Sequence, residues 1–318
     1  MSILLAILGP TATGKTALAA HLACELGGEV ISADSRQVYR GMDIGSGKDL
    51  WDYQVGDYQV PYHLIDIADP GYEYNIFEYQ RDFLAVYRDI AARDKVPVLC
   101  GGSGMYLDAI LRGYRLAGAA TGEACPADLQ EKSFGQLVDL LRSYKTPHNI
   151  TDFEDRPRLV KAIMVARASA TGDSADKDQP VSAGGSPDQP FPKIDSIIFG
   201  ISYPRELLKI RISARLEDRL ANGMVGEVEA LLQQGISPGR LMKYGLEYRY
   251  VTLFVTGRMS HPEMSERLNI AIRQFAKRQM TWFRHMERRG MKINWIDGLL
   301  PTEKRAELVR IILNRLAG

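Results

Sequence analysis

Short apolar segments alternate with longer segments of mixed polarity along most of the chain. The apolar segments are typical of buried strands, and they lie at residues 3–8, 29–33, 62–67, 96–100, 194–201 and 292–296. Between them, residues 15–26 and 75–92 repeat apolar positions at steps of three and four, which predicts helices. Such alternation predicts an α/β fold with a parallel sheet and helices on both faces. Ligands in these sheets bind at the carboxyl ends of the strands.

The alternation breaks after residue 113 and returns at residue 194. Turn-rich and helical patterns fill the interval, at residues 117–126, 134–141, 156–168 and 171–192. We interpret residues 114–193 as an inserted helical domain, which ends in a mobile loop at residues 171–192 that is rich in Gly, Pro, Ser and Asp. Residues 1–113 and 194–318 are assigned to the core, whose last third is mainly helical.

Composition changes this picture little. Of 318 residues, 45% are apolar and 25% charged, which is ordinary for a soluble protein, and the net charge of +1 does not by itself indicate a nucleic-acid binder. No apolar run approaches the roughly 20 residues that span a bilayer, so we expect a cytoplasmic protein without membrane contact. Cys24, Cys100 and Cys125 are too scattered to favour a disulfide or a zinc site.

The first predicted strand runs into a phosphate-loop motif, G-x-x-x-x-G-K-S/T, formed by Gly9, Pro10, Thr11, Ala12, Thr13, Gly14, Lys15 and Thr16. Its glycines let backbone N–H groups close around phosphate oxygens, Lys15 adds a cation, and the Thr16 hydroxyl can ligate Mg²⁺. A chance glycine turn is the alternative, but the strand-loop-helix context favours phosphate binding. The motif does not identify the phosphorylated compound.

Two further polar groups follow predicted strands. Asp34 comes directly after residues 29–33, and it can be a general base or the cap of a following helix. Ser103 lies in a glycine-rich turn after residues 96–100, where nucleotide hydrolases of this kind carry a Mg²⁺-binding Asp. Its hydroxyl can cap the next helix and also donate a hydrogen bond to a leaving oxygen.

Two basic segments allow a structural and a functional interpretation. Five cations stand mainly at steps of four on the predicted helix at residues 205–222: Arg205, Lys209, Arg211, Arg215 and Arg219. Spacing alone favours a solvated face paired with acids, although Arg211 and Arg215 could clamp a diphosphate. Residues 267–292 interleave basic residues with Phe275, Trp282 and Phe283, which suits RNA binding as well as a helix with an aromatic core face.

Together these motifs resemble the tRNA dimethylallyltransferase (tRNA isopentenyltransferase) family over the whole chain. The resemblance is carried by the phosphate loop and by the blocks at residues 32–39, 41–45, 63–66, 101–106 and 274–284, with Arg158 and Lys161. It implies a P-loop NTPase-like core with an inserted helical tRNA-binding domain. It also implies transfer of a dimethylallyl group from its diphosphate to N6 of the adenosine 3′ of the anticodon, in tRNAs that read codons beginning with U.

The resemblance further implies roles for individual residues. Asp34 accepts the N6 proton, Ser103 bonds the departing oxygen, and Lys15, Arg215 and a Mg²⁺ held partly by Thr16 neutralise the diphosphate. The tRNA anticodon stem-loop is contacted by Asp34, Ser35, Arg36, Gln37 and Ser103, and by Pro157, Arg158, Leu159, Val160 and Lys161 of the insertion. We expect a monomer.

Three positions depart from the family pattern. Ser103 stands where the family commonly has Thr, which removes the methyl group that fixes the rotamer, and Lys161 replaces an Arg and loses its bidentate fork. The segment Glu247-Tyr248-Arg249 replaces Gly-Tyr-Lys/Arg, and no role is assigned to it. A small-molecule P-loop kinase and a non-catalytic RNA-binding protein with a relict loop remain the alternatives.

Overall fold

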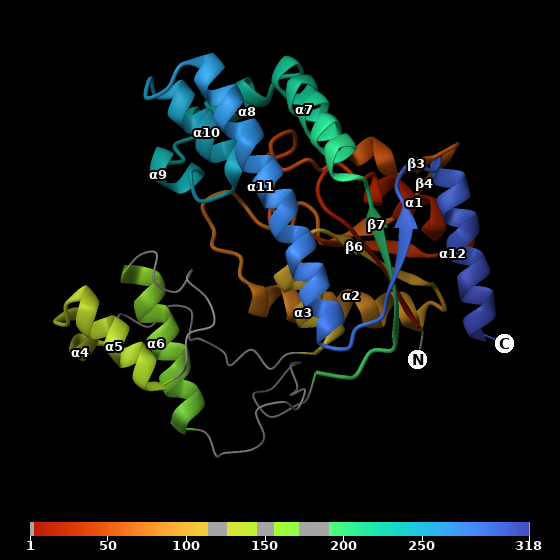
Figure 1. Cartoon of the computed structure of the whole chain (residues 1–318), viewed down its shortest axis with the longest axis horizontal. Helices are drawn as coiled ribbons and strands as arrows, with labels where there is room; N and C mark the ends of the chain where they lie inside the picture. The colour runs from red at the N-terminus through yellow and green to blue at the C-terminus, as the bar shows by residue number, and fades with distance from the viewer. Residues whose placement is uncertain (1–2, 114–125, 145–155, 172–190, 318) are drawn as a thin grey trace. The chain divides into compact units, whose positions relative to one another are not determined.

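A six-stranded sheet forms the centre of the protein, and all of its strands are parallel (Figure 1). The computed structural model describes residues 3–113, 126–144, 156–171 and 191–317. The strand order is β5-β2-β6-β1-β7-β8. The strands are β1 (Leu4–Leu8), β2 (Glu29–Ala33), β5 (Tyr62–His63), β6 (Pro97–Gly101), β7 (Ser196–Ser202) and β8 (Ile293–Asp297). The predicted parallel α/β fold is therefore confirmed.

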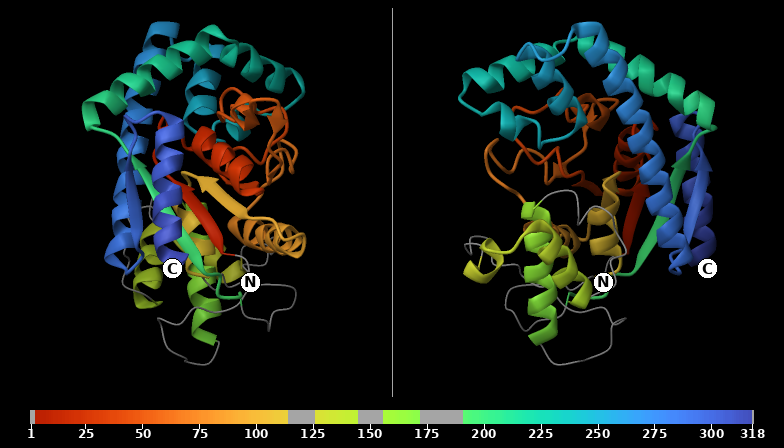
Figure 2. Two further views of the ribbon diagram at one scale, coloured as in Figure 1. Left: turned by 90° about the vertical axis from the view of Figure 1, so that its right-hand side faces the viewer. Right: turned by 60° about the vertical axis from the view of Figure 1, so that its left-hand side comes forward.

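Helices cover both faces of this sheet (Figures 1 and 2). On one face, α1 (Lys15–Leu26) packs against α12 (Thr302–Ala317) and the short turn η1 (Leu50–Tyr53). On the other, α2 (Ile76–Ala92) packs against α3 (Gly104–Leu111). The apolar strand β1 and the Leu and Ala face of α1 are buried in this core. Removing their apolar surface from water is the main contribution to the stability of such a core.

A second apolar core lies among the helices that follow β7. It brings together α7 (Arg205–Ala221), α8 (Met224–Gln233), α9 (Pro238–Leu241), α10 (Leu246–Val255) and α11 (His261–Arg288). Val38 and Met42, both fully buried, join this core from the segment after β2. A small hairpin of β3 (Gln54–Val55) and β4 (Tyr58–Gln59) lies elsewhere, beside α1 and η1, where Val55 packs against the core of the sheet.

The chain divides into two compact units, one formed by residues 1–113 and 192–318 and the other by residues 114–191. In the second unit, α4 (Ala127–Gln130), α5 (Phe134–Tyr144) and α6 (Arg156–Thr171) are described. Leu159 and Val160 are buried there with Leu137 and Leu141, so both side chains belong to the core of this unit, and their contact with tRNA stays a prediction. Most of the predicted loop at residues 171–192 lies outside the described residues.

Most predicted elements coincide with observed ones, and the largest difference is in the third predicted strand. Residues 62–67 were expected to be extended, but β5 ends at His63. Leu64 and Asp66 have φ angles of 60° and 55°, in the left-handed region that ends a strand. The helix predicted at residues 75–92 is α2, and Asn75 begins it with a capping box to Glu78.

The expectations about membrane contact and about the cysteines can be compared with the described residues. Among them, no helix has both the length and the apolar character that crossing a membrane requires. Cys24 and Cys100 are free thiols, and Cys125 lies outside the described residues.

A buried carboxylate at the start of β2 makes stability depend on pH. The Glu29 side chain is 4% exposed and contacts Arg93 and His63, the latter at 2.7 Å between Nε2 and Oε2. Hydrogen bonds from Arg93, followed by one from His63, lower the pKa of Glu29 to about 2. A lowered carboxyl pKa stabilises the fold above the unfolded-state value, and this contribution is lost as pH falls toward 2.

We therefore expect the free energy of unfolding of the Glu29→Gln variant to fall less than that of the parent between pH 7 and pH 3. The difference should be about 2 kcal/mol, measured by urea denaturation at both pH values. Glu206→Gln is the control, because Glu206 is an exposed partner of Lys209. An equal pH dependence for Glu29→Gln and the parent would contradict this account.

Candidate active site

Three loops meet at one edge of the sheet because their strands end in register. Leu8 of β1 is paired with Gly101 of β6, and Gly101 is paired with Ala33 of β2. The phosphate loop, Asp34 and the Gly102-Ser103 turn therefore leave three neighbouring strands at the same level. This edge is where ligands bind in parallel α/β sheets.

The phosphate loop has the backbone conformation that its motif predicts. Gly14 has φ +72° and Ala12 has φ +63°, and the buried Thr13 hydroxyl donates to the Pro10 carbonyl at 2.8 Å. Gly14 begins α1 without a side-chain hydrogen bond to the first N–H groups of the helix. Those N–H groups and the helix dipole are therefore available to an anion.

Lys15 faces a set of opposed charges at this edge. Burial lowers the pKa of its ammonium, and the positive charge of Arg215 acts in the same direction. Asp34 and Asp49 favour the charged ammonium and act against that shift. Lys15 is partly exposed and lies within electrostatic range of both carboxylates at the edge of the site.

Asp34 and Ser103 lie on either side of Ser35, and neither caps a helix through its side chain. Asp34 Oδ1 accepts the Arg36 N–H at 2.9 Å within a turn, so the helix-cap interpretation of Asp34 is wrong. Ser103 is the N-cap residue that precedes α3, but its hydroxyl makes no capping hydrogen bond. It accepts the Ser35 N–H at 3.2 Å instead, which ties β6 to the segment after β2.

Gln37 is a buried residue of the segment after β2. It is 8% exposed, its Oε1 accepts from the Ser32 hydroxyl at 2.8 Å, and its Nε2 donates to the Gly47 carbonyl at 2.9 Å. The side chain holds the loop at Gly47 against β2, and its contact with the adenosine stays a prediction. Ser35 and Arg36 remain partly exposed.

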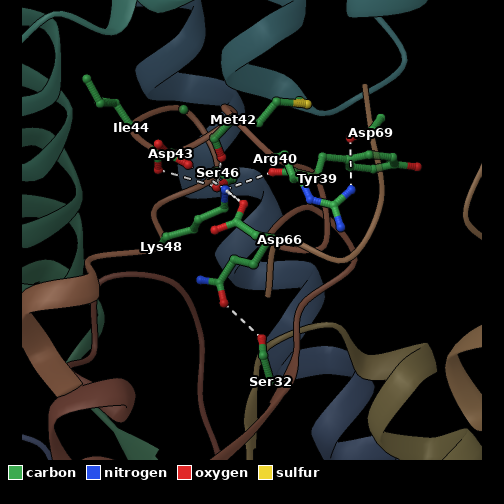
Figure 3. A network of polar contacts seen from close by, with 12 residues as sticks. Ser32, Tyr39, Arg40, Met42, Asp43, Ile44, Ser46, Lys48, Asp66 and Asp69 are labelled. Atoms are coloured by element: carbon green, nitrogen blue, oxygen red, sulfur yellow. Dashed lines mark hydrogen bonds and ion pairs between the residues drawn. The ribbon is translucent and has the colours of Figure 1, made fainter. Parts of the chain in front are cut away.

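Lys48 is a buried residue whose structural role the sequence interpretation missed. It is 1% exposed, and its ammonium donates to the Tyr39 carbonyl at 2.7 Å and to the carboxylates of Asp43 and Asp66 (Figure 3). A buried lysine needs such partners, because an unpaired ammonium in a core is costly. The lysine closes the loop at residues 41–48, and nothing in its spacing distinguishes it from a surface cation.

The cationic row on α7 divides into two kinds of residue. Lys209 pairs with Glu206 at 2.9 Å, as the solvated-face interpretation expects. Arg211 instead donates to the Ala12 carbonyl at 2.9 Å, and Arg215 donates to the Thr11 hydroxyl at 3.3 Å. Both arginines therefore contact the phosphate loop, which the solvated-face interpretation does not include, although Arg211 is exposed and Arg215 also pairs with Asp49.

Gln279 of α11 joins the two loops that line the site. Its Oε1 accepts the Thr11 N–H at 2.9 Å, and its Nε2 donates to the Gly102 carbonyl at 2.8 Å. Gln279 is 7% exposed, and a β-carbon on Gly102 would lie 2.5 Å from its amide nitrogen. The residue stands in a block that matches the family, but its position in a basic and aromatic segment gave no indication of this role.

The rest of α11 has features of a helix with an aromatic core face and also of an RNA-binding surface, the two interpretations of its composition. Phe283 is fully buried, and Trp282 packs against Gly104. Phe275 is 37% exposed, with the Arg278 guanidinium 5.8 Å from its ring centre, and Lys277 and Arg284 are exposed. One side of the helix forms core and another presents cations with an aromatic ring.

The fold and this edge define a parallel α/β protein with a phosphate loop beside an aspartate and a serine. The family model described as IPP transferase matches residues 37–286, and one described as isopentenyl transferase matches residues 2–54. The chain belongs to the IPP transferase family, as its sequence blocks indicated.

Relatives and solved structures extend this similarity over nearly the whole chain. A tRNA dimethylallyltransferase 2 of Bacteroides fragilis is 51% identical over 307 residues, covering 96% of each chain. A tRNA dimethylallyltransferase 1 of Parabacteroides distasonis is 50% identical over 314 residues, covering 98% of each. The crystal structure of a tRNA isopentenylpyrophosphate transferase from Staphylococcus epidermidis has a TM-score of 0.68 and 27% identity, covering 99% of each chain.

The tie made by Gln279 can be tested by diphosphate binding. In the Gln279→Leu variant both loops lose a buried hydrogen bond, so we expect the Kd of magnesium diphosphate to rise about tenfold. Isothermal titration calorimetry measures this change, and Gln274→Leu, at an exposed position of the same helix, should bind as the parent does. Unchanged binding by Gln279→Leu would show that the loops hold their positions without the tie.

Proposed function

We propose that this protein transfers a dimethylallyl group from dimethylallyl diphosphate to N6 of the adenosine 3′ of the anticodon, in tRNAs that read codons beginning with U. The observation that carries the proposal is the meeting of the phosphate loop, Asp34 and Ser103 at one sheet edge. Membership of the IPP transferase family and the names of relatives about 50% identical support it.

Asp34 is proposed as the general base. Its Oδ1 is held by the Arg36 N–H, and among the described residues Oδ2 has no hydrogen-bond partner, which leaves it for the incoming amine. An exocyclic amine on an aromatic ring is a weak nucleophile, because its lone pair is delocalised. As N6 bonds to the first prenyl carbon, the bond from that carbon to the diphosphate oxygen breaks and Asp34 takes the N6 proton.

The departing diphosphate gains charge in this step, and the cations at the sheet edge are proposed to stabilise it. Lys15 and Arg215 supply positive charge, and the N–H groups at the start of α1 supply hydrogen bonds. Ser103 is proposed to donate its proton to the bridging oxygen. Its oxygen already accepts from Ser35, so the hydroxyl proton is free to turn toward the ligand.

Mg²⁺ is proposed as the cofactor, with Thr16 as its ligand from the protein. Thr16 lies in the first turn of α1, as the motif requires for a hydroxyl that reaches a metal on bound phosphate. Among the described residues, no cluster of three or more His, Cys, Asp or Glu side chains could hold a metal. Thr16 would hold the ion together with water and diphosphate oxygens, and the ion would supply positive charge beside the leaving group.

The anticodon stem-loop is proposed to contact both units. In the larger unit, the partly exposed Ser35 and Arg36 lie beside Asp34, and α11 exposes Lys277, Arg278 and Arg284. In the smaller unit, the proposed contacts are Pro157, Arg158 and Lys161 of α6. Pro157 and Arg158 stand four and three positions before Lys161. Leu159 and Val160 have the supporting role of core residues.

The proposed reaction is tested by label transfer. Enzyme, Mg²⁺, dimethylallyl diphosphate labelled in the prenyl group and unmodified tRNA should yield labelled tRNA and free diphosphate. A tRNA with guanosine in place of the target adenosine is the matched control, and it should stay unlabelled. If ATP is added to the same mixture and is consumed while the label stays in dimethylallyl diphosphate, the prenyltransfer proposal is wrong and the kinase alternative is favoured.

The role of Asp34 predicts a separation of catalysis from binding. The Asp34→Asn variant keeps an oxygen for the Arg36 N–H but loses the base, so we expect kcat to fall by about 10² to 10⁴. The Kd for tRNA, measured by filter binding, should change less than about threefold. If the parent is active and the variant turns over at a similar rate, Asp34 is not the general base. If neither protein is active, the alternative of an RNA-binding protein with a relict phosphate loop is favoured.

A further inference from the structure

Asp49 occupies a helix-cap position without acting as a cap. It precedes η1, the short turn at Leu50–Tyr53, and its side chain makes no hydrogen bond to that turn. Its φ of +42° lies in the left-handed region, which residues other than glycine seldom adopt. Its carboxylate instead pairs with Arg215 and lies 3.5 Å from Arg219 Nη2, both on α7. An acid suited to capping is thus directed at two arginines.

The loop before Asp49 is held by polar contacts at Lys48 and at residues 43–45. The neighbouring Lys48 is held by a carbonyl and two carboxylates, as described above. Further back, the Glu227 carboxylate accepts the N–H groups of Asp43, Ile44 and Gly45 at 2.7, 2.7 and 3.0 Å. Because these partners fix the backbone, the position of the Asp49 carboxylate is also defined.

Gly47 shows how closely α7 approaches this loop. It has φ +68°, and a β-carbon there would lie 1.9 Å from Arg219 Nη2. Only glycine therefore lets the Arg219 guanidinium lie against the loop and reach Asp49. Burial lowers the pKa of Arg219, so the guanidinium is in a desolvated position where a nearby carboxylate matters.

We propose that Asp49 is a positioning residue for the diphosphate site, which acts by holding Arg215 across the phosphate loop. Arg215 Nη1 donates to the Thr11 hydroxyl, and Nη2 donates to Asp49. A guanidinium has five N–H donors in a fixed plane, so these two bonds set its orientation and leave the other donors for phosphate oxygens. This inference rests on the proposed function, because it assigns the donor's diphosphate to the phosphate loop.

The alternative to positioning is that the Asp49 carboxylate weakens donor binding. A carboxylate near a diphosphate repels it, so an Asp49 that only competed for Arg215 would weaken donor binding. Arg219 shares the negative charge of Asp49, and among the described residues Arg215 keeps N–H donors without a protein partner, so the geometry favours positioning. The two roles predict opposite signs when the carboxylate is removed.

The experiment compares Asp49→Ala and Asp49→Asn with the parent. For Asp49→Ala we expect the KM for dimethylallyl diphosphate and the Kd of magnesium diphosphate to rise about tenfold, which is the size of one hydrogen bond to a charged group. The KM for tRNA should stay within about twofold of the parent. Asp49→Asn keeps an oxygen acceptor for Arg215 and should show a smaller rise. Asp57→Ala, at an exposed position of the β3–β4 hairpin, is the control.

A double-mutant cycle then tests whether Asp49 acts through Arg215. The Kd of magnesium diphosphate is measured by calorimetry for Asp49→Ala, Arg215→Ala and the double variant, and we expect the first change to have no effect once Arg215 is absent. Additive effects, or tighter binding by either Asp49 variant, would overturn the proposal. If Asp49→Ala does not fold, Asp49→Asn takes its place in the cycle. If the parent shows no label transfer, the proposed function fails, while the calorimetric cycle still tests Asp49.

Discussion

The site depends on one constraint, which is that β1, β2 and β6 end at the same level of the sheet. Each strand carries a different chemical group at its end, and none of these groups is close to another in the sequence. The pairing of Leu8 and Ala33 with Gly101 brings the loops to one level, and a shift of register would move a whole loop away from the others. Buried apolar strands with many partners keep this register.

Polar contacts from distant helices hold the loops that these strands deliver. Gln279 joins two loops, Arg211 and Arg215 contact the phosphate loop, and Glu227 fixes the segment after Met42. These side chains come from helices whose apolar faces form the second core. The same packing that buries those faces therefore also sets the positions of the cations around the phosphate loop.

The sequence predicted the parts of the protein that local rules control. Strand and helix positions follow apolar periodicity, and the phosphate loop follows glycine conformation and a fixed spacing, so both were accessible. The role of Asp49 was not, because it depends on Arg215, 166 residues away. Gln37 and Lys48 have partners within 18 residues, but those contacts depend on how an irregular loop folds back on itself, which local rules do not specify. Arg211 and Arg215 show the same limit: their spacing equals that of Lys209, but the fold gives them different neighbours.

The hydrogen bond between the Ser35 N–H and the Ser103 hydroxyl bears on how much the side chain at position 103 can vary. A threonine methyl restricts rotation about χ1 by steric crowding, and a serine lacks that restriction. Here a backbone donor from the neighbouring strand selects the rotamer, so the orientation is supplied by the fold and not by the side chain itself. The direction of the hydroxyl at position 103 thus depends on the Ser35 N–H, which gives the missing threonine methyl a substitute in the backbone.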